Sequence, residues 1–371
     1  MVDDLSAIPP EIRTLADYEK HAEACLPAAS WDHIQSGSGS DSALRDNRAA
    51  FDRWRLLPNV LTDLRGASTE TELFGRAHVA PIMVAPLAYQ CLAHPDGEMA
   101  AARAAAALET GFILSTLSSV SLEHVAQASR SAARELTKPV APLWFQLYLQ
   151  PDRADSLTLV RRAEAAGYEA IVLTIDAAIK RSEFTLPAGI EAANLQGMAK
   201  PRQHSVAGGH ILFGTPLADA APTWADVEWL RSVTDLPILL KGLVTGEAVD
   251  RAVASGVEAI VLSNHGGRVF DGFPAALDVL AHVVARAGHR LPILVDGGFR
   301  SGSDIATALA LGAKVVLIGR PVFHALAVAG LSGVAHMLHI LRTELELAMA
   351  QLGCPRIELL DSGRLLPHRQ A

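Results

Sequence analysis

Short runs of apolar residues recur from residue 80 onward, and each is followed by a turn and an amphipathic or alanine-rich segment of helix length. Eight of these runs predict buried strands: Ile82–Ala85, Phe112–Ser115, Trp144–Tyr148, Ala170–Asp176, Pro237–Lys241, Ala259–Asn264, Pro292–Asp296 and Val315–Gly319. Parallel strands require crossover segments of this kind. Eight strand–helix units favour a closed barrel over an open sheet, because closure removes both edges. The predicted fold class is therefore α/β, a (β/α)8 TIM barrel.

The segments outside the barrel pattern read as helices that extend the same domain. Residues 1–65 carry apolar positions at helical spacing and form the predicted N-terminal helical extension. The run Ser36–Ser40 alternates serine and glycine, which favours a tight turn over a flexible linker. The residues from about 322 onward are again helical in pattern. We expect one domain over residues 1–371, with the barrel at 80–330 and C-terminal helices on its exterior or against a neighbouring subunit.

One crossover is longer and less regular than the others. Between Asp176 and Pro237 only residues 224–233 read as a clear helix, and Pro, Gly and Ala occur in no regular order. Long irregular loops in compact domains are usually functional lids or disordered segments. Because this one follows a barrel strand, we interpret residues 177–222 as an irregular active-site loop.

The composition limits the class of protein. The chain has 371 residues, 50% of them hydrophobic, and a net charge of −8 with acids and bases mixed along its length. This balance argues against nucleic acid or an anionic membrane as a partner. Cys25, Cys91 and Cys354 lack metal-ligand spacing, the N-terminus is acidic, and we find no apolar run of roughly 18 residues. We expect a cytoplasmic protein with no metal site and no membrane partner.

Polar side chains collect where the predicted strands end. In a barrel these ends meet at one face, which is where the active site lies. The face would carry an amide, a phenol, carboxylates, an ammonium, an imidazole and several guanidinium groups: Gln146, Tyr148, Thr174, Asp176, Lys241, His265, Arg268, Asp296, Arg300 and Arg320.

These strand-end residues suggest three chemical roles. His265 and Asp176 suit a general base and its orienting carboxylate, and Arg268 suits a substrate carboxylate. Glycines and arginines after the last two strands suit a phosphate group: Gly298, Arg300, Gly319 and Arg320. Taken singly, His265 reads as a structural histidine, Lys241 as a salt-bridged lysine and Asp176 as a helix cap. The joint pattern favours a phosphate-bearing cofactor beside a small carboxylate substrate, and it does not identify the cofactor.

The run Ser263–Arg268, SNHGGR, resembles the signature of the FMN-dependent 2-hydroxy acid oxidases and dehydrogenases, which include glycolate, lactate and 4-hydroxymandelate oxidases. Similar matches extend over most of the chain: Ala85–Ala88, His94–Glu98, Thr116–Ser119, Trp144–Tyr148, Leu240–Gly242, Asp296–Gly298, Arg300–Gly302 and Ile318–Pro321. The run Thr116–Leu122 is most similar to the 4-hydroxymandelate oxidase type. The resemblance implies FMN as cofactor and oxidation of an (S)-2-hydroxy acid to the 2-oxo acid.

The resemblance also implies a role for each strand-end residue. His265 would be the base, supported by Asp176. The sequence does not decide whether Cα gives up a hydride or loses a proton to form a carbanion. Arg268 and Tyr148 would hold the substrate carboxylate and hydroxyl, and Lys241 would stabilise the reduced flavin. The further flavin contacts it implies are Pro86, Leu87, Ala88, Ser118, Gln146, Thr174, Ser263, Asp296, Gly298, Arg300, Gly319 and Arg320.

The chain departs from the family pattern at three positions. His33 stands where the family usually has Tyr or Phe in the substrate pocket, so it either binds the carboxylate or fills the phenyl position. The segment after Asp176 is shorter than usual, and Arg181 is a candidate for the second carboxylate-binding arginine. Leu87 replaces a residue that is often small or polar. The substrate side chain is therefore left open.

The electron acceptor is inferred from the resemblance as well. Alanine at position 88 and the lack of a cytochrome domain favour O2 over a quinone or another acceptor. A non-redox FMN barrel of the isopentenyl diphosphate isomerase type and a flavoprotein with only a binding role are the alternatives. The family resemblance also implies a homo-oligomer, commonly a tetramer.

Overall fold

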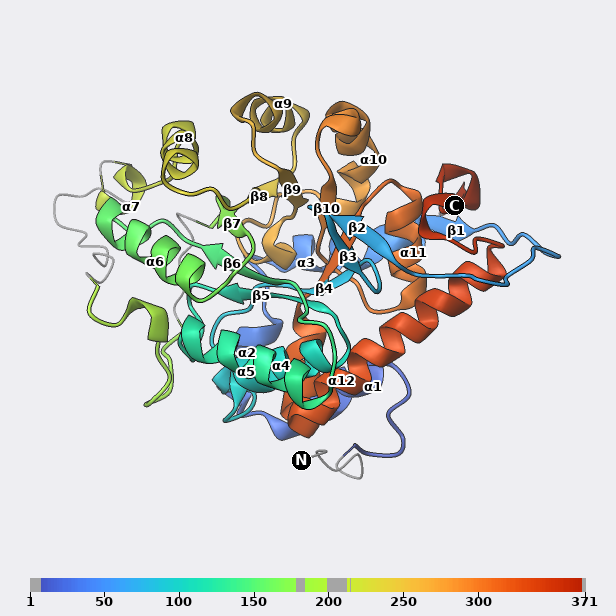
Figure 1. The fold of residues 1–371 in the computed structure, drawn as a ribbon, viewed down its shortest axis with the longest axis horizontal. Helices are drawn as coiled ribbons and strands as arrows, with labels where there is room; N and C mark the ends of the chain where they lie inside the picture. Colours follow the sequence, from blue (N-terminus) through green and yellow to red (C-terminus); the bar gives the residue numbers. More distant parts are fainter. Residues whose placement is uncertain (1–7, 178–183, 199–211, 214, 369–371) are drawn as a thin grey trace.

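Eight parallel strands form a closed barrel in the computed structural model, which describes residues 8–177, 184–198, 212–213 and 215–368. The strands follow one another around the barrel in chain order, and the last pairs with the first (Figure 1). Their bounds are β4 (Ile82–Val84), β5 (Gly111–Ser115), β6 (Leu143–Leu147), β7 (Ile171–Thr174), β8 (Ile238–Leu243), β9 (Ala259–Leu262), β10 (Ile293–Val295) and β11 (Val315–Ile318). All eight predicted strands are present, and the predicted (β/α)8 barrel is confirmed.

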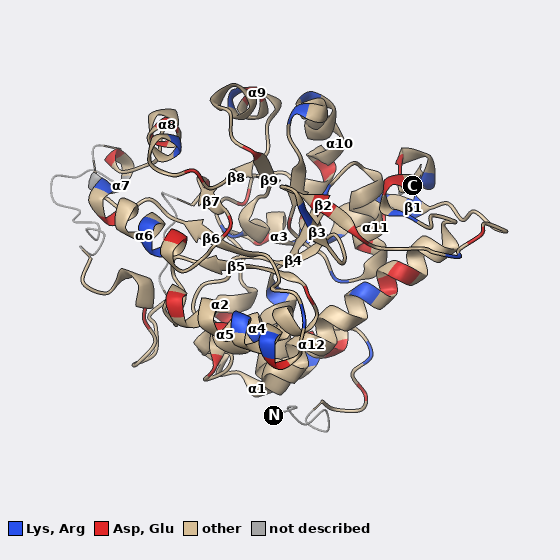
Figure 2. Cartoon of the chain, viewed as in Figure 1, with Lys and Arg blue, Asp and Glu red and all other residues tan. Residues whose placement is uncertain are grey.

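Helices surround the barrel (Figure 1), and buried apolar residues of most of them share one core with apolar residues of the strands. They are α4 (Gly97–Ala107), α5 (Leu122–Glu135), α6 (Arg153–Ala165), α7 (Pro216–Asp219), α8 (Trp224–Val233), α9 (Gly246–Ser255), α10 (Ala276–Ala287), α11 (Gly302–Ala310) and α12 (Arg320–Gln351). Figure 2 shows basic and acidic residues interspersed along these helices, whereas the strands carry few charges. The charges therefore mark the solvent side of the helical layer.

The barrel interior is filled by large apolar side chains that alternate with the outward-facing set. Met83, Trp144 and Leu317 are buried there together with apolar residues from the other strands. A hairpin that the sequence analysis missed closes the barrel at the amino ends of its strands: β2 (Thr71–Leu73) and β3 (Arg76–His78). The ring of Phe74, at the turn of this hairpin, lies 5.6 Å from that of Trp144. The amino end of the barrel is thus sealed, and a ligand can enter from the side of the carboxyl ends of the strands.

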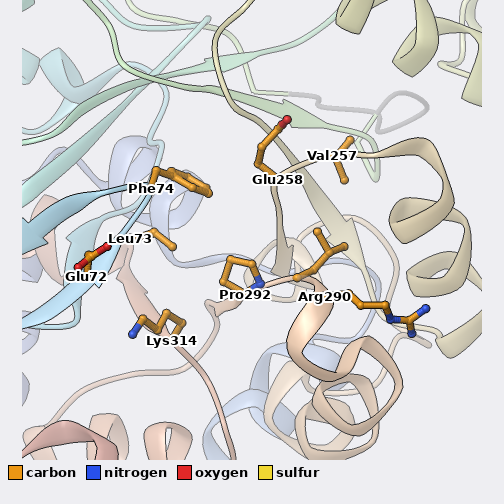
Figure 3. Close-up of a pocket in the computed structure, with 9 residues that line it drawn as sticks. Glu72, Leu73, Phe74, Val257, Glu258, Arg290, Pro292 and Lys314 are labelled. Carbon is orange, nitrogen blue, oxygen red and sulfur yellow. The ribbon is translucent and has the colours of Figure 1, made fainter.

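An open depression of about 500 Å³ lies outside the sealed end (Figure 3). Its rim carries both charge signs, from Glu72, Glu258, Arg290 and Lys314. The Glu258 carboxylate accepts hydrogen bonds from the Ile238 N–H at 2.7 Å and from Arg231 at 3.2 Å. Since that carboxylate holds the framework together, we assign the depression no chemical role.

The N-terminal extension reaches the carboxyl ends of the barrel strands. Its helices are α1 (Leu15–Cys25), α2 (Ala28–Gln35) and α3 (Ser42–Asp52), and the serine–glycine run between α2 and α3 is a turn, as predicted. Asn47 on α3 and Asn264 after β9 exchange two hydrogen bonds of 3.0 Å. The extension ends in a strand that was not predicted, β1 (Trp54–Leu56), which pairs antiparallel with β12 (Leu365–Pro367). The extension is therefore part of the wall around the strand ends.

Helix α12 begins directly after β11 and is interrupted at Ala329 and Gly330. It packs against α1, α4 and α11, as expected for a helix on the barrel exterior. By length and composition it is the one helix within the described residues that could cross a membrane, although the sequence analysis found no such run. Because 67% of that window is buried inside the protein, its packing accounts for its apolar character.

Candidate active site

The carboxyl ends of the barrel strands open into a cavity of about 580 Å³. Most of the predicted site residues line it: His33, Pro86, Leu87, Ala88, Tyr148, Thr174, Lys241, His265, Arg268, Asp296, Gly298, Arg300, Gly319 and Arg320. The cavity thus combines a cationic side with an apolar side. Within the described residues, no group of three or more His, Cys, Asp or Glu side chains is arranged to hold a metal ion.

His265 and Asp176 form a close pair at one side of the cavity. The His265 Nδ1 atom lies 3.0 Å from the Asp176 Oδ1 atom, and the Asp176 side chain is only 3% exposed. Burial acts to raise the pKa of Asp176, but His265 and Lys241 outweigh it, so this pKa lies below its ordinary value. His265 itself has a positive φ of 58°, and its N–H donates to the Ser263 hydroxyl at 2.9 Å. A strained, carboxylate-paired imidazole on a cavity wall is typical of a general base.

A glycine after Lys241 makes room for this carboxylate. Gly242 has a φ of 112°, and a Cβ atom there would lie 2.6 Å from the Asp176 Cβ and Cγ atoms. The register of β8 against β9 shifts between Lys241 and Leu243, as at a β-bulge. The bulge and the missing side chain together let Lys241 and Asp176 lie side by side at the cavity.

Lys241 is a buried cation with two oxygen partners. Its Nζ atom lies 3.0 Å from the Asp296 Oδ2 atom and donates to the Ser263 hydroxyl at 2.9 Å. Burial opposes its charge, but the carboxylates of Asp296 and Asp176 outweigh this and raise the pKa of Lys241. Lys241 is therefore a fixed positive charge in the cavity floor.

Three arginines form the cationic side of the cavity. Arg268 donates to the Ile34 and Ser36 carbonyl oxygens at 3.0 and 2.8 Å, and Arg320 donates to the same two oxygens at 3.0 and 3.2 Å. Burial, with Arg268 and Arg300 nearby, lowers the pKa of Arg320 to about 9, and burial also lowers the pKa of Arg268. Such a cluster is costly without an anion, so the geometry favours an anionic ligand.

Most of the chain matches known flavin enzymes. The family model described as FMN-dependent dehydrogenase matches residues 22–366. The chain belongs to the FMN-dependent dehydrogenase family. It is 43% identical to an L-lactate oxidase from Nostoc sp., covering 95% of this chain and 97% of the relative, and 42% identical to the 4-hydroxymandelate oxidase of Amycolatopsis orientalis, covering 93% and 95%. A crystal structure of mandelate oxidase with (S)-2-phenylpropionate has 40% identity, a TM-score of 0.84 and coverage of 96% and 98%. The predicted family and the FMN cofactor are confirmed.

The cavity of this family member fits a flavin mononucleotide. Three buried polar atoms around it have no hydrogen-bond partner among the described residues, namely the Gln146 Nε2, Asp296 Oδ1 and Asp176 Oδ2 atoms. At Gly319, an added Cβ would meet only the Leu87 side chain, at 3.9 Å, so ligand atoms can approach the backbone there. Polar atoms that suit a ring and a ribityl chain therefore lie next to cations that suit a phosphate.

Several predicted residues do not line the cavity. Asp176, Gln146 and Ser263 lie behind the lining residues, and Arg181 lies outside the described residues. The Ser118 hydroxyl donates to the Val120 carbonyl at 2.5 Å and accepts from Asn194 at 2.9 Å. Its contact with flavin therefore stays a prediction, and its present partners give it a framework role.

Position 298 requires glycine for a steric reason that the sequence analysis missed. A Cβ atom there would lie 2.2 Å from the carbonyl oxygen of Asn47 on α3, and φ is 85°. The glycine was predicted from its suitability for a phosphate. It is required in any case by the close approach of the N-terminal extension.

The cavity has further lining residues that the sequence analysis missed. Tyr89 lines it with a positive φ of 55°, and Phe184 lines it with its ring stacked on His33 at 4.0 Å and 16°. Leu195 lies in the long loop after β7, next to Asn194, whose buried amide donates to Ser118 and accepts from the Leu122 N–H at 2.8 Å. The positions of these side chains depend on how the loops fold back, and no sequence signal indicated it.

Proposed function

We propose that this protein oxidises an (S)-2-hydroxy acid to the 2-oxo acid and passes two electrons and two protons to O2, giving H2O2. The observation that carries the proposal is the convergence on one cavity of a carboxylate-paired histidine, a buried lysine and an arginine. FMN, when bound, supplies the acceptor for the two electrons. The relatives named above are oxidases, which supports O2 as the terminal acceptor.

His265 takes a proton from the substrate in this proposal. Because its Nδ1 faces the Asp176 carboxylate, Nδ1–H donates there and Nε2 is the proton acceptor. The lowered pKa of Asp176 keeps this group anionic, and the anion stabilises the imidazolium that forms. Asp176 thus stabilises the charge that His265 carries after proton transfer.

Arg268 and Tyr148 hold the substrate carboxylate and hydroxyl. A guanidinium binds a carboxylate in a bidentate manner, which fixes the orientation of the substrate Cα–H bond. Burial, with a smaller effect of Asp176, raises the pKa of Tyr148, so the phenol stays protonated and donates a hydrogen bond. Lys241 compensates the negative charge that develops during the reaction, and Arg181 is proposed as a second carboxylate partner.

Cofactor contacts follow from the same arrangement. We assign the flavin ring to the neighbourhood of Lys241 and the strand ends, and the phosphate to the arginine side. The proposed contacts are Pro86, Leu87, Ala88, Gln146, Thr174, Lys241 and Ser263 for the ring, Asp296 for the ribityl chain, and Gly298, Arg300, Gly319 and Arg320 for the phosphate.

The preferred substrate carries an apolar side chain larger than methyl. Apolar residues form part of the cavity wall: Leu117, Leu149, Phe184, Leu186 and Leu195. The stacking of His33 on Phe184 supports a wall role for this imidazole, in the position where the family resemblance implied an aromatic ring. A wall of this kind favours an aryl or branched side chain over glycolate.

Anaerobic mixing with glycolate, (S)-lactate or (S)-mandelate tests the reaction through loss of the visible flavin absorbance. We expect the fastest bleaching with (S)-mandelate and recovery in air within the turnover time. Bleaching by none of a broad 2-hydroxy acid panel contradicts the proposal, and slow recovery in air assigns another acceptor. His265→Ala should retain flavin but lose reduction by substrate. Normal reduction in that variant would show that His265 is not the base.

We also propose a cytoplasmic homo-oligomer in which residues 1–371 act as one domain. Val60 and Leu61, in the loop after β1, are 75% and 102% exposed, and such apolar side chains favour burial against another copy. The three cysteines are free thiols, which supports a reducing compartment. Sedimentation at micromolar concentration tests the assembly, and a monomer would contradict it.

A further inference from the structure

Arg300 enters the cavity from the loop after β10, but it is held from outside the barrel. Its Nε atom donates to the Glu19 Oε2 atom on α1 at 3.2 Å, and its Nη1 atom donates to the Phe299 carbonyl at 3.1 Å. Among the described residues, no hydrogen bond is formed by Nη2. One edge of the guanidinium is therefore fixed by the protein, and the other is left for a ligand.

Glu19 is itself held by a chain of side chains. Its Oε1 atom accepts from Gln35 on α2 at 3.2 Å, and the same Gln35 nitrogen lies 3.0 Å from the His324 Nε2 atom on α12. His324 is fully buried, and burial lowers its pKa well below the ordinary value. A neutral His324 can accept the hydrogen bond from Gln35, so three helices cooperate to fix one carboxylate.

Positive charge exceeds negative charge around these hydrogen-bonded side chains. Arg268 and Arg300 lie close enough to Arg320 to lower its pKa, and the carboxylates of Glu19 and Asp41 act on that pKa in the opposite sense. A carboxylate this near a phosphate site would repel the phosphate if the two anions met directly. In this structure Glu19 meets the Nε edge of Arg300, so the guanidinium lies between the carboxylate and the cavity.

We propose that Glu19 is a positioning residue for the cofactor phosphate, and that Gln35 and His324 hold it in place. By fixing the Nε edge of Arg300, it presents the remaining edge in the orientation that a phosphate needs and removes the entropy cost of ordering a long side chain. The inference rests on the proposed phosphate role of Arg300. It does not depend on which hydroxy acid is oxidised.

Binding of FMN and of riboflavin to the apoprotein tests the inference. Riboflavin lacks the phosphate, so the ratio of its dissociation constant to that of FMN isolates the phosphate contribution, measured by quenching of flavin fluorescence. We expect Glu19→Ala to lower this ratio about tenfold, as removal of an outer-shell partner does at metal sites. Riboflavin affinity should stay unchanged. Glu19→Gln keeps an oxygen acceptor for Arg300 and should cause a smaller fall.

Glu23 provides a matched control, because it lies one turn further along α1 and is exposed. Glu23→Ala should leave both constants unchanged. An unchanged or raised ratio in Glu19→Ala overturns the inference, because it shows that the carboxylate is neutral or repulsive toward the phosphate. An equal loss of riboflavin and FMN binding also overturns it, because the role is then merely structural.

Arg300→Ala separates this inference from the proposed phosphate site. If the ratio collapses in Arg300→Ala but not in Glu19→Ala, the phosphate site stands and Glu19 does not position it. If Arg300→Ala leaves the ratio unchanged, both assignments are wrong. Since Glu19 is 36% exposed, its variants are expected to fold, and circular dichroism of the apoprotein checks this.

Discussion

Replacement of Asp176 by Asn tests the general-base pair most directly. The substitution preserves size and removes the charge 3.0 Å from the His265 Nδ1 atom. At about 4 Å between charge centres and an effective dielectric of about 20, the carboxylate stabilises an imidazolium by about 4 kcal/mol. Each 1.36 kcal/mol changes a rate tenfold, so flavin reduction should slow by up to about 10³-fold. The nearby Lys241 shares the carboxylate, which makes this an upper value.

The measurement is the rate of anaerobic flavin reduction at saturating substrate, followed by stopped-flow absorbance. Flavin content and the absorbance spectrum of Asp176→Asn should match those of the original protein, because the carboxylate lies behind the cavity lining. Asp250→Asn is the control, since Asp250 lies on α9 and pairs with Arg286 at the surface. A reduction rate within about threefold of the original in Asp176→Asn would refute the electrostatic account of the pair.

The structure leads to three further predictions. Burial lowers the pKa of His78 to about 4, so protonation favours the unfolded chain below pH 6.5. The free energy of unfolding should therefore fall by up to about 2 kcal/mol between pH 6.5 and 5. His78→Phe should flatten this pH dependence in urea titrations. Gly242→Ala places a Cβ 2.6 Å from Asp176, so flavin reduction should slow in parallel with Asp176→Asn; a normal rate contradicts this. Asn194→Ala removes the amide that ties the long loop to Ser118 and the Leu122 N–H, so KM should rise more than kcat falls; an unchanged KM contradicts this.

The barrel could be predicted because each strand is an apolar run that ends in polar residues, as in Ala259–Leu262 before Ser263. The missed strands are not apolar runs. β1, β2, β3 and β12 each contain exposed residues within only three positions, so no sequence signal indicated the β2–β3 hairpin or the β1–β12 pair. Residues at the ends of neighbouring parallel strands converge at one face, so the presence of His265 and Lys241 in one cavity was also predictable.

The supports of the site were not predictable. Arg268 and Arg320 bind main-chain carbonyls at the end of α2, and carbonyl groups occur at every residue, so they leave no sequence signal. Gly298 was interpreted through a ligand, although the backbone of α3 already excludes a side chain there. In both cases the decisive partner comes from the N-terminal extension, whose docking depends on three-dimensional packing that local pattern does not encode.

The same extension affects how the chain matures. Glu19, Ile34 and Ser36 are made early in synthesis, whereas their partners Arg268, Arg300 and Arg320 emerge only after most of the barrel has left the ribosome. Contacts between such distant segments form late, because the intervening loop entropy must be overcome first. We therefore expect the arginine side of the cavity to assemble near the end of folding. A chain that has not joined its two ends lacks this arrangement of arginines, so we expect it to bind FMN only after the extension has docked.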